Sequence, residues 1–559
     1  MTATPAATPS YNLARFSPRT HLLFALLLAA LVLIPRSALI ARAHSDCIDD
    51  EYHLVRGLQF WSPKTFGSSR LNDPPLGEAL SAIPLLFAGV QPDPATGSVL
   101  FNQRHTPDQL LLWIAIWKSI LFLPLIPIVF IWIRSIYSTR CAWLATLLIL
   151  FDPNLAAHIP VAAIDALGAE TIVIACYCAW RYFTRPTTIN LLLALLTLAI
   201  ALLTKHTAII LPLAISLYAA TRLFPSPGTP GEGRVRALPK RPLRTALLKT
   251  YLRHAAITLV AFPAIFFALT NFNLSKPKLS DEVTPTQKRL LSRPLPGGNY
   301  IASFANGLAH GRRGHAAYLF GEKSMKGWWY YFPVVSTYKI PVPTLLILTL
   351  ALATFFATRF RFCELSILIP LVAWTIFLML ARINIGFRHF LPAYLFILML
   401  ASRAALTAPR MRTIAFSLCA LSAIHATTFH PDYLSYLNFP RSKPWYAIND
   451  SNLDWGQSLK QIRRYLDTHP FPGRPIYLRF FHRPGAPNIP YYLGNRVTIL
   501  TEENNPPRTG ILIISPMHEA GVWDPQNRYA FLKPYPPTDT IGHAMLVYNL
   551  DQLRPPRKR

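Results

Sequence analysis

Residues 21–35 read HLLFALLLAALVLIP, and the apolar character continues to about residue 40, interrupted only by Arg36. About 20 apolar residues in a helix are enough to cross a bilayer core, so this stretch predicts a membrane-spanning helix. A cleaved signal peptide is the alternative, because Arg15 and Arg19 precede the run. No clear small-residue cleavage site follows it, and many apolar runs come later in the chain. We therefore expect a retained first helix.

Similar apolar stretches recur along the chain. Of its 559 residues, 52% are hydrophobic and 14% are charged, whereas soluble domains carry about 25% charged residues. These features predict an all-α polytopic membrane protein with about 11 transmembrane helices. The expected spans are residues 21–42, 108–136, 139–158, 160–182, 188–204, 206–223, 252–272, 341–358, 363–382, 388–406 and 411–429.

The charges of the connections indicate the orientation. With the N-terminus in the cytoplasm, every inner connection is basic and nearly free of acids, as the positive-inside rule requires. The net charge of +29 then comes from basic loops, and it does not indicate nucleic-acid binding. We expect a multi-pass protein of a bacterial-type inner (plasma) membrane with an extracytoplasmic C-terminal domain.

Three polar segments lie outside the membrane in this topology. The loops at residues 43–107 and 273–340 belong to a transmembrane domain of residues 1–429. The tail, residues 430–559, combines a helical pattern at residues 451–466 with the strand-like runs PIYLRFF, GILIISP and HAMLVYNL. This mixture predicts a small α/β domain on the outer face.

Acidic residues mark two places on the predicted outer face. Asp49, Asp50 and Glu51 follow the first span, and their mutual repulsion raises a carboxyl pKa and suits it to accept a proton from a hydroxyl. A solvated acidic turn that caps a helix explains these residues equally well. Asp165 is expected about five residues, or roughly 8 Å, inside the fourth span. An acid within a span costs on the order of 2.5–3.5 kcal/mol, so Asp165 is a functional candidate, with a structural hydrogen bond as the alternative.

Three cations, Lys205, Lys339 and Arg388, lie at the outer ends of predicted spans. Single cations at such positions usually extend toward lipid head groups. Beside two acidic sites, however, they suit the binding of an anionic phosphate. The sequence contains no Walker loop and no dinucleotide fingerprint. A membrane-borne phosphate ester is therefore favoured over a cytosolic nucleotide as the substrate.

Short motifs follow one another along most of the chain. They are DE at residues 50–51, NDPPL at 72–76, DPN at 152–154 with His158 and Asp165, LTK at 203–205, GH at 314–315, YLFGE at 318–322, GWWYYFP at 327–333, KIP at 339–341, GFRHFLP at 386–392 and DSNLDWGQ at 450–457. In this order they resemble the motifs of the GT-C superfamily of integral membrane glycosyltransferases. The resemblance is to the branch of protein O-mannosyltransferases and lipid A aminoarabinose transferases, although Asp73 stands where that branch usually has His.

The resemblance implies an inverting transfer of a sugar from a polyprenyl-phosphate donor to a hydroxyl acceptor. It implies that Asp50 is the general base with Glu51 in support, and that Asp165 orients the acceptor. The resemblance requires no cofactor. It leaves open whether Asp50 and Asp165 hold a divalent metal. The phosphate-binding residues implied are Lys205, Lys339 and Arg388. Candidate substrate-binding residues are His53, His158, His315, Trp328 and Trp329, although an aromatic belt also explains the tryptophans.

A membrane transporter or flippase for a lipid-linked or anionic substrate is the main alternative. Transporters place polar breaks near the midplane, often in matched repeats. Here the breaks lie at the outer ends of spans, which favours the enzyme. A non-catalytic assembly protein is the third hypothesis, and it leaves Asp165 and Lys205 unexplained. The expected partners are the polyprenyl-phosphate sugar, the bilayer and a protein, lipid or glycan acceptor, but not nucleic acid. The sequence leaves the sugar and the acceptor open.

Overall fold

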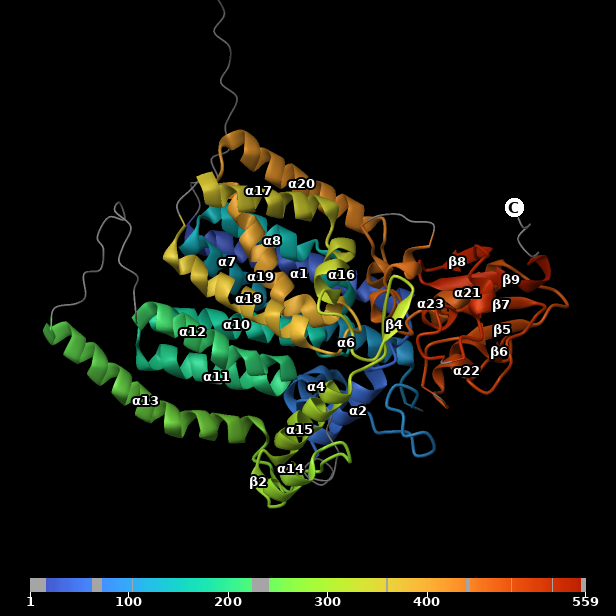
Figure 1. The fold of residues 1–559 in the computed structure, drawn as a ribbon, viewed down its shortest axis with the longest axis horizontal. Coiled ribbons are helices and arrows are strands. Elements are labelled where there is room, and N and C mark those ends of the chain that lie inside the picture. Colours follow the sequence, from blue (N-terminus) through green and yellow to red (C-terminus); the bar gives the residue numbers. More distant parts are fainter. Residues whose placement is uncertain are drawn as a thin grey trace, which may run out of the picture.

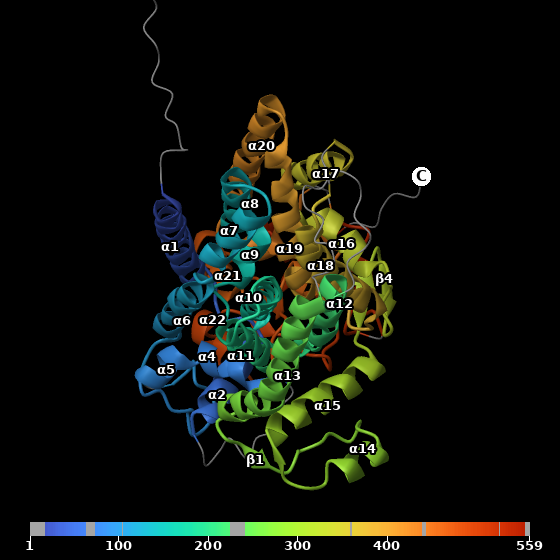
Figure 2. The same cartoon turned by 90° about the vertical axis from the view of Figure 1, so that its left-hand side faces the viewer.

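The computed structural model describes residues 17–62, 73–102, 104–223, 241–357, 360–438, 443–483, 485–524 and 526–553. Most of these residues are helical, and the long helices form a bundle with a small sheet at one end (Figure 1). Helix α13 lies on the side of the bundle away from the sheet, at the left of Figure 1 and toward the viewer in Figure 2. Asn72 of the NDPPL motif lies outside the described residues.

Polar caps start several of the bundle helices. The side chains of Ser17, Ser138 and Thr187 accept hydrogen bonds from backbone N–H groups in the first turns of α1, α8 and α11, which have no partner within the helix. The bundle helices are α1 (Pro18–Ala43), α6 (Pro107–Phe122), α7 (Leu125–Ile136), α8 (Thr139–Leu150), α10 (Asp165–Thr184), α11 (Thr188–Thr204), α12 (Leu211–Leu223), α13 (Arg241–Leu269), α17 (Val342–Ala357), α18 (Leu365–Leu380), α19 (Leu391–Ala401) and α20 (Pro409–Thr427).

Five helical stretches within the described ranges are long and apolar enough to cross a membrane. A sixth is added if α16 (Tyr331–Lys339) and α17, which meet at 115°, form one broken span. The chain is therefore a multi-pass membrane protein, as predicted. The eleven predicted spans are not confirmed, since α8 and α11 are apolar but have only 12 and 17 residues. The five stretches are Pro18–Ala43, Pro107–Ile136, Lys249–Leu269, Phe362–Leu380 and Phe387–Leu406.

The fourth predicted span, residues 160–182, is shorter than expected. A short helix, α9 (Pro153–His158), comes first, and residues 159–164 form bends. Pro160 lies in these bends, and its missing N–H disfavours a continuous helix. Asp165 is the first residue of α10. The expectation that Asp165 lies about five residues inside a helix is therefore wrong: it occupies a helix N-terminus, where the helix dipole stabilises a negative charge.

The loops of the two predicted outer segments contain short helices. In the first segment, the proline at the start of α4 suits a first helical turn, where no N–H is needed. The second segment adds two small antiparallel hairpins, β1 with β2 and β3 with β4. The elements are α2 (Asp50–Phe60), α4 (Pro75–Ser81), α5 (Ile83–Phe87), β1 (Leu274–Ser275), α14 (Pro285–Leu290), β2 (Leu295–Pro296), α15 (Gly298–Arg313), β3 (Ala317–Leu319) and β4 (Glu322–Ser324).

The tail contains a five-stranded sheet with the strand order β6-β5-β7-β9-β8. The three predicted strand runs form β5, β7 and β9, and every residue of β7 is buried, as its run of aliphatic side chains suggests. β5 pairs in parallel with β6 and β7, whereas β9 is antiparallel to β7 and β8. The division into two domains at residue 430 stays a prediction. The elements are α21 (Leu459–Thr468), β5 (Ile476–Arg479), α22 (Asn488–Leu493), β6 (Thr498–Ile499), β7 (Ile511–Ile514), α23 (Pro516–Glu519), β8 (Asp539–Ile541) and β9 (Met545–Asn549).

Candidate active site

A buried ion cluster lies at the N-terminal end of α10. Lys205 Nζ is 2.6 Å from Asp165 Oδ1, and Arg388 Nη1 is 3.5 Å from Asp165 Oδ2. The same guanidinium nitrogen is 3.4 Å from Asp49 Oδ2. Two cations and two acids from four distant parts of the sequence therefore meet in one place. We call Asp49, Asp165, Lys205 and Arg388 the ion cluster.

A glycine allows Lys205 to reach this cluster. Lys205 is the residue at which α11 ends, and its side chain crosses the surface of α10. A Cβ atom at Gly168 would lie 2.6 Å from Lys205 Cδ, which is too close for a carbon–carbon contact. The absence of a side chain at Gly168 therefore lets the lysine pass to Asp165.

The tail contributes an aromatic side chain to the cluster. The Arg388 guanidinium lies over the Trp455 ring, 4.1 Å from its centroid, and the Trp455 indole N–H donates to Asp49 Oδ2 at 3.1 Å. His158 packs against the same ring. Trp455 lies outside α21, which begins at Leu459, so the predicted helix at residues 451–466 starts later than expected. Asp49 belongs to the acidic run after the first span and Trp455 to the DSNLDWGQ motif, but neither was predicted to be a site residue.

Asp50 lies next to the cluster but is held by the backbone. Its side-chain oxygens accept N–H groups from Cys47 and Ala162 at 2.8 and 2.9 Å, and only 2% of the residue is exposed. Burial raises the pKa of Asp50 to about 6, although the two backbone donors act in the opposite direction. Such a carboxylate is ionised at neutral pH and remains a usable base. Glu51 instead accepts N–H groups from Val99 and Leu100, and so fixes the loop that precedes α6.

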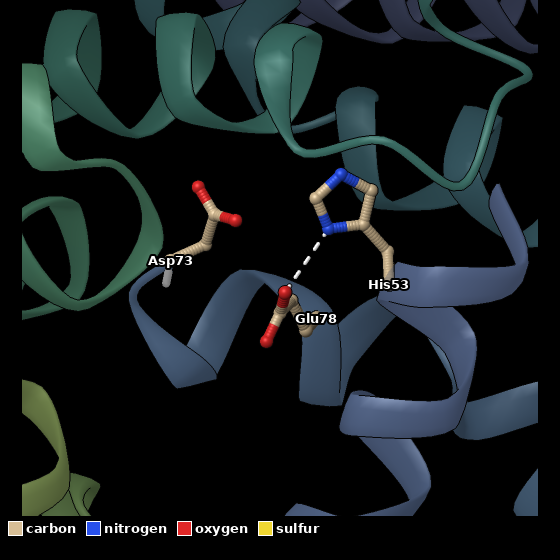
Figure 3. A group of neighbouring side chains, drawn as sticks. All are labelled: His53, Asp73 and Glu78. Atoms are coloured by element: carbon tan, nitrogen blue, oxygen red, sulfur yellow. Dashed lines mark hydrogen bonds and ion pairs between the residues drawn. The ribbon is translucent and has the colours of Figure 1, made fainter. Parts of the chain in front are cut away.

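A second charged group surrounds His53 (Figure 3). His53 Nδ1 is 3.0 Å from Glu78 Oε1, and Arg56 lies 3.3 Å from Glu78 and 3.8 Å from Asp73. Burial lowers the pKa of His53. The hydrogen bond to Glu78 and the charge of Glu78 together outweigh this effect and raise the pKa to about 9. The imidazole is therefore protonated at neutral pH, and two cations balance two acids. We call these four residues the His53 network.

The two groups of residues differ in what they offer a metal ion. His53, Asp73 and Glu78 offer ligand atoms within 4.8 Å of one another. A histidine must be neutral to ligate a metal, so metal binding there would displace the proton of His53. Asp50 and Asp165 were the predicted metal ligands. The carboxylate oxygens of Asp50 accept backbone N–H groups, and two cations face the carboxylate of Asp165.

The His53 network gives a stability prediction. We expect Glu78→Ala to destabilise the protein by about 3–5 kcal/mol, because it leaves two buried cations without their shared partner. Thermal unfolding of the purified protein in detergent measures this as a lower melting temperature. Glu282→Ala, which removes an exposed partner of Arg313, is the matched control and should change little. Loss of stability on adding EDTA, with recovery on adding Zn²⁺, would show a metal site instead.

The remaining predicted site residues lie in other surroundings. Lys339 Nζ donates to the backbone carbonyls of Leu434, Tyr436 and Asn452 at 2.8–2.9 Å, so its three N–H groups hold the tail. This differs from the predicted role in phosphate binding, which needs free donors. His315 packs against Trp523, whereas Trp328 donates its backbone N–H to Asn384 and Trp329 is 64% exposed.

The chain has relatives among known families and folds. Residues 55–275 match the family model of dolichyl-phosphate-mannose-protein mannosyltransferase. ArnT from Cupriavidus metallidurans bound to undecaprenyl phosphate is 12% identical, with a TM-score of 0.47 over 95% of this chain and 98% of ArnT. The apo Archaeoglobus fulgidus oligosaccharyltransferase is 14% identical, with a TM-score of 0.47 over 83% of this chain and 63% of that chain. No curated protein sequence matches. The family match covers less than half of the chain, and it agrees with the predicted resemblance to membrane glycosyltransferases.

Proposed function

We propose that this GT-C-type membrane protein transfers a sugar from a polyprenyl-phosphate donor to a hydroxyl acceptor, with inversion at the sugar carbon. The ion cluster is the observation that carries the proposal. Lys205 and Arg388 converge on one buried carboxylate, beside a second acidic side chain and a base candidate. Buried cations arranged in this way are suited to stabilise a phosphate that gains charge as it leaves.

Each group has a defined part in the proposed step. The acceptor oxygen forms a bond to the anomeric carbon, and the bond from that carbon to the phosphate oxygen breaks. The bonding electron pair stays on the lipid phosphate, where Lys205 and Arg388 stabilise it. The proton of the acceptor hydroxyl goes to Asp50. Asp165 holds both cations in position, and Asp49 and Trp455 hold the Arg388 guanidinium from the other side.

The same arrangement favours an enzyme over a transporter or flippase. A transporter must release its anion, and a matched pair of repeats around a midplane site is typical. Here the cluster forms at helix ends, where α10 begins and α11 stops. Sidedness belongs to the proposal as well: we place the N-terminus in the cytoplasm and the ion cluster on the outer face of the membrane.

Consumption of a lipid-linked sugar tests the proposed function. We expect the purified protein in mixed micelles to convert radiolabelled polyprenyl-phosphate sugars to free polyprenyl phosphate, whose release thin-layer chromatography measures. The donors tested are the mannose, glucose and aminoarabinose esters, since the sugar is open. Movement of intact donor across a vesicle bilayer without its consumption would contradict the proposal and indicate a flippase.

A further inference from the structure

A pocket lies beside the ion cluster and is distinct from it. Its volume is about 380 Å³, within the roughly 300–1,000 Å³ range of small-molecule sites, and it is partly open to solvent. The lining comes from the first part of α2 with the residues just before it, from the loop at residues 96–101, and from residues 456, 481–483 and 485–488 of the tail. We call it the lateral pocket.

Hydrogen bonds between these segments hold the lateral pocket in shape. Glu51 accepts the backbone N–H groups of Val99 and Leu100 and so ties α2 to the loop. Asn488 Nδ2 donates to Asp46 Oδ2 at 3.1 Å and so ties the tail to the segment before α2. A pocket fixed by contacts within the chain needs little ordering when it binds a ligand.

Two polar groups in the lateral pocket have bonding capacity to spare. Asp46 is 5% exposed, and within the described part of the chain its Oδ1 atom is buried without a hydrogen-bond partner. A buried acceptor of this kind is costly unless a donor reaches it. The Arg483 side chain is 42% exposed and lies against the Tyr52 ring, and its Nη2 atom is 4.0 Å from Asp49 Oδ1. Arg483 therefore connects the pocket to the ion cluster.

The lining selects against ligands with a single charge. An anion would meet Asp46 and Glu51, and a cation would meet Arg56 and Arg483. A hydroxyl group can donate to a carboxylate and accept from a guanidinium, and Asp46 and Arg483 supply these two groups to the lining. Phe101 and Phe481 add apolar surface to the lining, against which the C–H face of a ring can pack.

We propose that the lateral pocket binds a neutral sugar ring of the acceptor, so that the acceptor is a glycan rather than a peptide. The inference rests on the proposed function, and it assigns the tail the task of choosing the acceptor. Arg483 lines the pocket and lies 4.0 Å from Asp49, so a glycan held there lies next to the ion cluster.

The probe is a panel of methyl hexopyranosides, with serine- and threonine-containing peptides in parallel. We expect saturation-transfer NMR to show binding of at least one glycoside to the full-length protein, and that glycoside to act as the acceptor. Arg483→Ala should raise its KM at least tenfold and leave kcat within threefold. Ala486→Trp, which fills the pocket, should have the same effect. Arg496→Ala removes a tail arginine that pairs with Asp467 outside the pocket, and it should behave as wild type.

Slow hydrolysis of the donor by water separates the two proposals, since it needs no acceptor. It should be unchanged in Ala486→Trp, which fills the pocket without contacting the ion cluster. Transfer to peptides alone, or an unchanged glycoside KM in both variants, overturns the lateral-pocket assignment and leaves the proposed function intact. Absence of any donor consumption, with the NMR signal still lost in Arg483→Ala, overturns the proposed function and supports the pocket.

Discussion

Replacing Asp50 by asparagine is expected to lower the rate of sugar transfer by about 10²–10⁴-fold, the usual contribution of a general base. The carboxylate is held by the N–H groups of Cys47 and Ala162, so its direction is fixed before the substrate binds. Asp50 also lines a small hollow between the end of α1 and the tail. An asparagine has nearly the same shape but cannot take the proton.

The pH dependence of the rate gives this prediction a second readout. Burial raises the pKa of Asp50 to about 6, against the effect of its backbone donors. A base works only when it is ionised, so the wild-type kcat/KM should fall as the pH is lowered through about 6 and level off above it. The residual activity of Asp50→Asn should lack this dependence. A mutant that keeps the wild-type profile would show that another group titrates.

Asp49→Asn is the matched control, because it makes the same carboxylate-to-amide change in the neighbouring residue. Asp49 interacts with Arg388 and Trp455, and Asp165 also holds Arg388, so we expect a smaller loss than for Asp50→Asn. Both proteins should elute as wild type in size-exclusion chromatography. An inactive Asp49→Asn beside an active Asp50→Asn would identify Asp49 as the base.

The fold could be predicted where one kind of side chain dominates a stretch. The apolar run at residues 21–35 lies in α1, and the run GILIISP contains β7, because composition and length decide these cases. The predictions were less accurate where prolines and polar residues interrupt an apolar stretch. Pro160 and its neighbours form bends rather than the start of a span. Hydropathy averages over such breaks, so it overestimates the length of a helix.

The kinds of residue in the candidate site could be predicted from the sequence, but the ion pairs between them could not. Lys205 and Arg388 were predicted from charge at the ends of spans, and Asp165 from an acid within a span. The structure brings these three together. Lys339 carries the same sequence signal, but it is surrounded by backbone carbonyls. Trp455 is some 290 residues from Asp165 in the sequence, so only the folded tail shows that it joins the cluster. Which of several equivalent charges meet is decided by long-range packing.

Replacing Arg388 by alanine is expected to lower kcat by about 10²–10³-fold, the typical loss when one donor to a developing negative charge is removed. The guanidinium is planar and offers donors in several directions. It can therefore interact with Asp49 and Asp165 while another N–H group faces the phosphate. Its Nε atom is buried and has no hydrogen-bond partner within the described residues, which leaves donor capacity for a ligand.

Measurements of the lipid product distinguish a phosphate-binding role from a structural one. Free polyprenyl phosphate should inhibit the wild-type enzyme, and its inhibition constant should rise at least tenfold in Arg388→Ala. Arg388→Lys keeps the charge but not the planar fork, so it should recover only part of the rate. Arg382→Ala is the matched control, because this exposed arginine donates to the carbonyl of Arg312 and lies outside the ion cluster. Arg388→Ala with a lower melting temperature but a wild-type inhibition constant would show that Arg388 supports the fold alone. In that case Lys205 would have to stabilise the leaving phosphate without it.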